Sequence, residues 1–204
     1  MLAVPAFAQD YTIMAQASPG CGWDATARTL QSVLQAEGIA PSVEVINVPG
    51  AGGTVGLAQF ATGKAGDPSK LIVGGYVMVG AILTNDSPVM PDDVTPIARL
   101  SGENVAITGD QRLDGIDAPT LAEAGYDVVV QNWRMVAAAP GITPEQTAGI
   151  IADFDRLNAS EGWAKALETQ GWMNIYLAGS AFAEVLREET AATESILRDI
   201  GLIE

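Results

Sequence analysis

The stretch Asn47-Val48-Pro49-Gly50-Ala51-Gly52-Gly53-Thr54-Val55-Gly56 joins a predicted strand to a predicted helix. The β-branched run 42–46 precedes it, and the apolar segment 57–61 that follows is typical of a helix start. Such a turn leaves backbone N–H groups unpaired at the positive end of a helix dipole, where an anion is stabilised. We therefore expect Gly50, Ala51, Gly52, Gly53 and Thr54 to contact a ligand. The alternative is a tight turn that lets the helix approach the sheet.

A second turn of the same kind, Ser18-Pro19-Gly20-Cys21-Gly22-Trp23-Asp24, follows the strand-like residues 11–15. It opens a predicted helix over 24–37. Two such turns on consecutive strand–helix units can face one small ligand, and their N–H groups favour a carboxylate. The predicted ligand contacts in this turn are Ser18, Gly20, Cys21, Gly22, Trp23 and Asp24.

Three residues of this second turn have alternative interpretations. Trp23 can form an apolar wall of the ligand site or belong to the core. Asp24 is expected to cap the helix by accepting from its free N–H groups and to pair with Arg28, although its charge would repel a carboxylate. Cys21 lies near a helix start, where a thiol can be activated, so a small α/β enzyme that uses Cys21 is an alternative function.

Two further segments supply candidate residues. Tyr76 and Met78 follow the third strand at its carboxyl end, where ligands of α/β proteins bind, and core packing explains Met78 equally well. Asn132, Trp133 and Arg134 lie between two predicted strands near residue 130. Arg134 could bind a carboxylate with two parallel hydrogen bonds, but a surface arginine is the simpler interpretation. Tyr76 and Asn132 complete the predicted ligand site.

Composition excludes several classes of function. The net charge of −15 repels nucleic acid and anionic lipid. The chain has no histidine, which excludes Ser-His-Asp and Cys-His catalysis and His-ligated metals, and its one cysteine cannot form an internal disulfide. The glycine turn at 47–56 has Val55 where a dinucleotide fingerprint needs its third glycine. We therefore expect no cofactor, metal or catalytic residue, and a protein that is not an enzyme.

The order of elements predicts one α/β domain. Strands are expected at 11–15, 43–47, 71–73, 95–100, 105–108, 126–130 and 135–139. Helices are expected at 24–37, 53–62, 77–83, 143–158 and 160–171, and in a last helix capped by Ser180. The helix at 143 has Thr143 and Gln146 spaced for a capping box. Such alternation predicts three layers, with a mainly parallel sheet and helices on both faces.

The amino terminus resembles the end of a secretory signal. Ala3-Val4-Pro5-Ala6-Phe7-Ala8-Gln9 contains an Ala-x-Ala cleavage pattern, which makes residues 1–8 a signal-peptide remnant and 9–204 the mature domain. A frayed apolar terminus is the alternative. No apolar run reaches the length of a membrane span, so we expect no direct membrane insertion.

These motifs together resemble the periplasmic solute-binding subunits of tripartite tricarboxylate transporters. Both glycine turns are similar to that family's two ligand loops. Asp93-Val94-Thr95-Pro96-Ile97-Ala98-Arg99-Leu100 is similar to the segment that leaves the first lobe, and the segments 119–126 and 132–143 are similar to the return. The resemblance implies a type II periplasmic-binding-protein-like lobe and a periplasmic location. It also implies a small di- or tricarboxylate ligand and delivery of that ligand to membrane permease subunits.

The chain departs from the family in two ways. Family members are longer because a second lobe lies between the outgoing and returning segments, and here that lobe is expected to be missing between about residues 103 and 112. A truncated remnant that binds nothing is therefore a further alternative. Cys21 stands where the family commonly has glycine, and cysteine is a poor fit if that position needs a positive φ.

Overall fold

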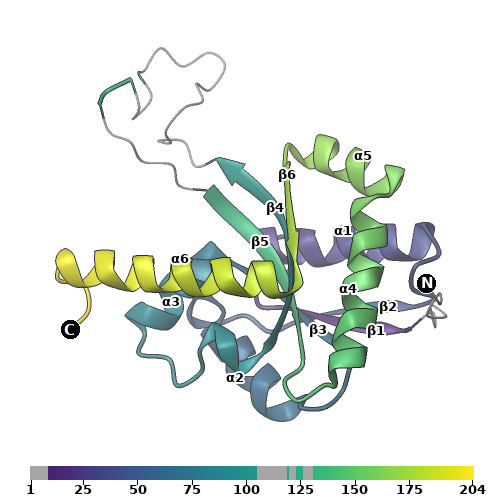
Figure 1. Cartoon of the computed structure of the whole chain (residues 1–204), viewed down its shortest axis with the longest axis horizontal. Helices are drawn as coiled ribbons and strands as arrows, with labels where there is room; N and C mark the ends of the chain where they lie inside the picture. Colours follow the sequence, from purple (N-terminus) through teal and green to yellow (C-terminus); the bar gives the residue numbers. More distant parts are fainter. Residues whose placement is uncertain (1–8, 105–118, 120–122, 126–130) are drawn as a thin grey trace.

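One six-stranded sheet forms the centre of the protein, in the spatial order β2-β1-β3-β5-β4-β6 (Figure 1). The computed structural model describes residues 9–104, 119, 123–125 and 131–204. The strands are β1 (Tyr11–Ala15), β2 (Val43–Asn47), β3 (Lys70–Gly75), β4 (Thr95–Asn104), β5 (Gln131–Ala138) and β6 (Met173–Ala178). The predicted strands 105–108 and 126–130, the signal remnant 1–8 and most of the predicted junction at 103–112 lie outside the described residues.

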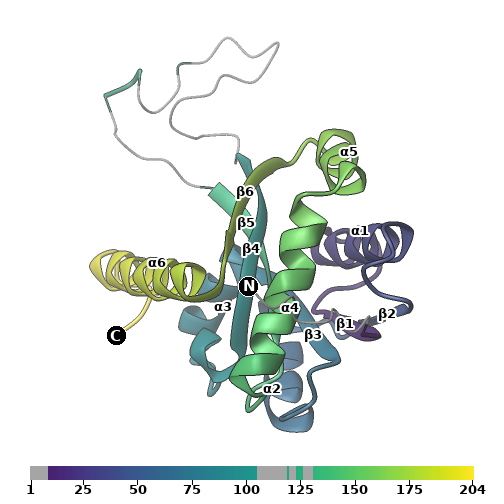
Figure 2. The ribbon, with the colours of Figure 1, turned by 45° about the vertical axis from the view of Figure 1, so that its right-hand side comes forward.

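Helices cover both faces of this sheet, which confirms the predicted three-layer α/β class (Figures 1 and 2). One face carries α1 (Gly22–Ala36), α4 (Pro144–Asn158) and α5 (Glu161–Gln170), whose apolar residues share one core cluster. The other carries α2 (Thr54–Gly63), α3 (Tyr76–Thr84) and α6 (Gly179–Asp199), which share the second. The short 3-10 turns η1 (Ala51–Gly53) and η2 (Pro91–Asp93) precede α2 and β4.

The apolar pattern of each element follows from this layering. Leu71 and Val73 of β3 face the α1 side, whereas Ile72 faces the α3 side. A strand with both faces covered reads as a continuous apolar run, which is why 71–73 was recognisable from sequence. Leu30 and Leu34 lie one turn apart on α1 and are fully buried, as helical spacing requires.

The sheet is mixed, which corrects the prediction that it is mainly parallel. β1 pairs in parallel with β2 and β3, as expected for consecutive strand–helix units. β5, however, enters between β3 and β4 and runs antiparallel to both, and β6 is antiparallel to β4. The alternation of elements fixes the first half of the sheet, whereas the later strands pair with sequence-distant partners that a local pattern does not reveal.

Helix starts were predicted with mixed success. The capping box at α4 is confirmed, because Gln146 N–H donates to Thr143 Oγ1 at 3.2 Å and Thr143 N–H donates to Gln146 Oε1 at 2.8 Å. Ser180 does not cap α6, because β6 runs directly into that helix and its N-cap is Ala178. β6 itself is not among the predicted strands. No helix in the described parts of the chain is both long and apolar enough to cross a membrane.

Candidate functional site

Both glycine loops lie at the same edge of the sheet. β1 and β2 are parallel neighbours whose registers end together at Ala15 and Asn47, and a loop follows each. Asn47 ties the two loops together, since its Nδ2 donates to Ala17 O at 2.9 Å and to Asp24 Oδ1 at 2.9 Å. The two loops therefore lie together at the carboxyl edge, as the loop motifs predicted.

The first loop is a locked turn leading into α1. Cys21 N–H donates to Ser18 O at 3.1 Å, and Gly20 adopts a φ of +87°. Cys21 is the N-cap of α1, with a φ of −79° and no side-chain hydrogen bond to the helix. Cysteine therefore fits this position without strain. It also leaves the N–H groups of the first helical turn uncapped.

Asp24 is not the N-cap that the sequence suggested. It lies inside the first turn of α1 and reaches back, where its Oδ2 accepts from Gly20 N–H at 2.8 Å. The predicted ion pair is confirmed, with 3.0 Å between Arg28 Nε and Asp24. Burial alone would raise the pKa of this carboxyl, but the hydrogen bonds from Gly20, Arg28 and Asn47 outweigh it and lower the pKa to about 2. Asp24 therefore braces the two loops as a fixed anion.

The second loop adopts a conformation that needs its glycines. The four residues Gly50 to Gly53 all have positive φ, including Ala51 at +44°. Gly53 N–H donates to Gly50 O at 2.9 Å, while Thr54 contributes both its N–H and its Oγ1 to Ala51 O. These bonds close the turn on itself. The exposed residues Ala51 and Gly52, whose N–H groups do not donate within the turn, remain the ones available to a ligand.

Gly53 is where the two loops touch. A Cβ at this position would lie 2.6 Å from Gln16 Oε1 and 2.9 Å from Trp23 Cζ3. Trp23 is half-buried and packs against both core clusters, so it contributes to the core while part of its ring stays exposed at this edge. Gln16 is 2% exposed, and its Nε2 donates to Val73 O at 3.0 Å. The tight-turn interpretation of the glycines thus holds for Gly53.

A hollow of about 230 Å³ opens beside the first loop. It is lined by Ala17, Cys21, Gly22, Trp23, Val77, Asn132 and Arg134. The structure thus brings Cys21, Gly22 and Trp23 together with Asn132, which follows them by more than a hundred residues in the chain. Ser18, Gly20, Asp24 and the turn Gly50 to Thr54 lie near this edge without lining the hollow.

Arg134 is buried, so the interpretation as a surface arginine was wrong. The residue is 9% exposed, and a Cβ on Gly22 would lie 2.9 Å from its Nη2. Its Nη2 and Asn132 Nδ2 both donate to Glu103 Oε1, the latter at 2.9 Å. Arg134 Nε, Asn132 Oδ1 and Gln16 Oε1 are buried atoms without a hydrogen-bond partner in the described structure. Buried polar atoms are nearly always hydrogen-bonded, so these three unpaired atoms near the first loop require an explanation.

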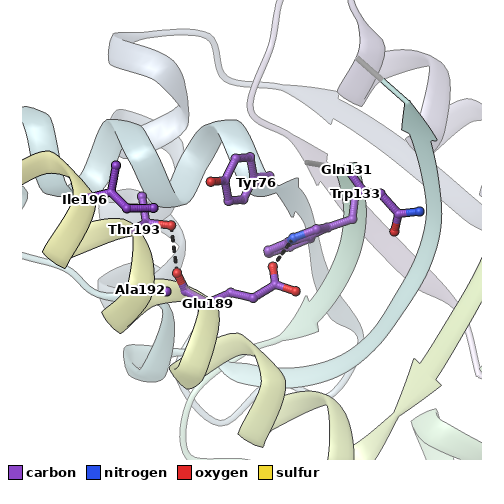
Figure 3. A pocket seen from close by; sticks show the side chains of 7 residues that line it. All are labelled: Tyr76, Gln131, Trp133, Glu189, Ala192, Thr193 and Ile196. Atoms are coloured by element: carbon purple, nitrogen blue, oxygen red, sulfur yellow. Dashed lines mark hydrogen bonds between the residues drawn. The ribbon is translucent and has the colours of Figure 1, made fainter. Parts of the chain in front are cut away.

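Tyr76 lines a different hollow, of about 240 Å³, on the α6 side of the sheet (Figure 3). Its ring centroid lies 6.2 Å from that of Trp133, which is 2% exposed and belongs to the core. Trp133 Nε1 donates to Glu189 of α6, and Arg99 Nη1 lies 3.7 Å from the same carboxylate. Met78 is fully buried, so core packing explains it. Tyr76 and Asn132 therefore do not share one hollow.

Sequence reasoning missed Gln16, Glu103 and Glu189. Gln16 directly follows β1, a position that could have suggested a role at the carboxyl edge. The two glutamates belong to no motif, and their partners are distant in sequence. Within the described residues, no group of three or more His, Cys, Asp or Glu side chains could hold a metal ion.

Solved structures with the same fold include a solute binding protein and a periplasmic binding protein. A TctC solute binding protein from Polaromonas is 16% identical, with a TM-score of 0.76 over 94% of this chain and 98% of that chain. The periplasmic binding protein BugD is 13% identical, with a TM-score of 0.76 over 96% and 98%. MatC from Rhodopseudomonas palustris, solved with bound malate, is 18% identical, with a TM-score of 0.70 over 93% and 99%.

These likenesses confirm, at the level of the fold, the resemblance predicted from the loop motifs. The chain has the periplasmic-binding-protein-like fold, and two of these neighbours are described as a solute binding protein and a periplasmic binding protein. No protein-family model matches the sequence. No curated protein matches it either.

Proposed function

We propose that this chain is a periplasmic solute-binding protein that captures a small di- or tricarboxylate and delivers it to membrane permease subunits of a tripartite tricarboxylate-type transporter. The observation that carries the proposal is the meeting of an uncapped helix N-terminus and a buried guanidinium at one hollow. The shared fold with a malate-bound protein supports the choice of ligand class.

The donors at the hollow suit a carboxylate. The first-turn N–H groups of α1 have no intrahelical acceptor, and the helix dipole gives that end a positive potential. Gly22 and Trp23 bring these groups to the wall of the hollow, and Arg134 adds a guanidinium that is paired with Glu103 in this structure. A guanidinium matches a carboxylate in shape and can donate two parallel hydrogen bonds to it. The second loop adds the N–H groups of Ala51 and Gly52, which are exposed residues at the same edge.

Binding by this chain alone is expected to be weak. The net charge of −15 repels an anion at long range, so attraction must act within the Debye length of about 10 Å. In a single lobe the bound ligand stays exposed to solvent. Each neutral hydrogen bond then contributes a net free energy of roughly 0.5–1.5 kcal/mol, and each hydrogen bond to a charged group roughly 1.5–3 kcal/mol. Two or three such contacts, less the cost of association, give a Kd in the range of about 1 mM.

Titration with malate and with citrate tests the proposal. Binding is measured by calorimetry and by chemical-shift mapping of the backbone amide groups. We expect a Kd of about 1 mM and chemical-shift changes confined to the two loops and to residues 132–134. Arg134→Gln should abolish detectable binding. Arg187→Gln, an exposed arginine on α6, makes the same charge change away from the site and should leave binding intact. Equal binding by the two variants would refute the proposed site, and micromolar binding would imply a second lobe supplied by another copy.

A further inference from the structure

Glu103 already places a carboxylate on the side-chain donors of the hollow. Its Oε1 accepts from Asn132 Nδ2 at 2.9 Å and also from Arg134 Nη2. The sheet register causes this arrangement, because Glu103 of β4 lies directly opposite Asn132 of β5. Both donors line the hollow. A ligand carboxylate would need the same two groups, so Glu103 and the ligand have overlapping partners.

The two members of this ion pair have unequal freedom. The Arg134 side chain is 10% exposed, whereas the Glu103 side chain is 39% exposed. Arg134 is also confined by the close approach of Nη2 to Gly22. A long side chain at the surface can exchange its partner for water at little cost, but a buried cation cannot be left unpaired. Glu103 is therefore the member that can leave, provided that another anion replaces it.

The pairing also leaves donor capacity unused. A guanidinium has five N–H donors in a fixed fork, and here Glu103 engages it through one oxygen. Arg134 Nε is buried without an acceptor within the described residues, and so is Asn132 Oδ1 without a donor. Both atoms are enclosed while Glu103 is in place, so a ligand with a second polar group beside its carboxylate, such as the hydroxyl of malate, can bond to them only once Glu103 has left.

We infer that Glu103 is a tethered competitor of the ligand. It neutralises Arg134 when no ligand is bound, and the ligand's carboxylate displaces it. This inference rests on the proposed function. Because an uncharged solute cannot replace the charge of Glu103, the exchange selects for anions. It also lowers affinity, since every binding event must break the contacts of Glu103.

The test is malate titration of Glu103→Gln. The amide keeps the size of the side chain and an acceptor oxygen for Arg134, but removes the competing charge. We expect its Kd for malate to be at least about tenfold lower than that of the unmodified chain. Glu168→Gln is the matched control, because Glu168 is an exposed residue of α5 and its removal changes the net charge equally. Its Kd should stay within about twofold of the unmodified value.

The outcomes separate this inference from the proposed function. If Glu103→Gln binds malate equally or more weakly while Arg134→Gln loses binding, Glu103 positions Arg134 and the inference is overturned, but the proposed function stands. If the unmodified chain and every variant fail to bind, both are overturned. An NMR measurement on the unmodified chain tests the inference without relying on a variant that could misfold. Saturation with malate should shift the Glu103 side-chain carboxyl resonance together with the Arg134 Nε–H resonance, and an unmoved Glu103 signal would overturn the inference.

Discussion

Replacement of Gly53 by alanine tests whether the two loops are packed as the structure shows. Gly53 has a φ of +97°, and a side chain in this left-handed region costs roughly 1–2 kcal/mol. The new methyl group would also lie 2.6 Å from Gln16 Oε1 and 2.9 Å from Trp23 Cζ3. Gln16 is held by its bond to Val73 O, so it cannot move aside freely. Overpacking of this kind adds roughly 1–3 kcal/mol.

The two contributions sum to about 2–5 kcal/mol of lost stability for Gly53→Ala. For a domain of this size each 1 kcal/mol lowers Tm by about 2–4 °C, so the variant should melt roughly 10 °C lower. Thermal unfolding followed by circular dichroism measures this shift. Urea unfolding then provides the free energy directly.

Two other glycines separate backbone strain from steric contact. Gly20 has a φ of +87° with no heavy atom within 4 Å of a built Cβ, so Gly20→Ala should cost roughly 1–2 kcal/mol from the backbone alone. Gly63, at the end of α2, has neither a positive φ nor a neighbour within 4 Å, and Gly63→Ala should stabilise by roughly 0.4–1 kcal/mol. If Gly53→Ala melts no lower than Gly20→Ala, the loops do not touch at Gly53 and the described site geometry is wrong.

Two further substitutions test buried acids. The pKa of Asp24 is lowered from 3.8 to about 2, so its ionised form stabilises the fold by about 2 kcal/mol above its unfolded pKa. This contribution disappears as pH falls from 3.8 towards 2, and Asp24→Asn should lose it at neutral pH while showing a flatter stability profile in acid. Tyr11→Phe removes the 2.7 Å hydrogen bond to Asp153, whose pKa is already raised by burial. Urea unfolding should show a loss of roughly 1.5–3 kcal/mol at neutral pH that shrinks once Asp153 is protonated, and an unchanged difference across pH would contradict it.

The parts of the fold that the sequence predicted are those with local causes. β1 and β2 match the predicted residues, and the box of Thr143 and Gln146 marked the start of α4 because both bonds lie within four residues. The direction of β5 depends on pairing with β3 and β4, which are far away in sequence. β6, at Met173–Ala178, has partly buried positions almost throughout, so it lacks the alternation that reveals a strand.

In the candidate site, too, the features with local causes were predicted and those that depend on distant residues were not. The glycine motifs predicted two tight turns at the same edge of the sheet. Their conformation and their location both follow from consecutive parallel strand–loop–helix units. The prediction that Asp24 is the N-cap was wrong, because helix α1 begins at Gly22, two residues earlier than expected. The Asp24 carboxylate instead accepts a hydrogen bond from Gly20 N–H. The burial of Arg134 was not predictable from its neighbours in sequence. It results from β5 lying in the middle of the sheet with Gly22 packed against the guanidinium.

The carboxyl edge is rich in donors, and the chain satisfies many of them with its own carboxylates. Asp24 binds Arg28, Glu103 binds Arg134 and Asn132, and Glu189 binds Trp133. The side chain of Asp24 is 4% exposed and held from several sides, so it is a permanent part of the scaffold. Glu189 is 33% exposed but faces the other hollow. Glu103 combines exposure with donors that line the hollow at the uncapped end of α1, and that combination makes it the carboxylate for which a solute can substitute.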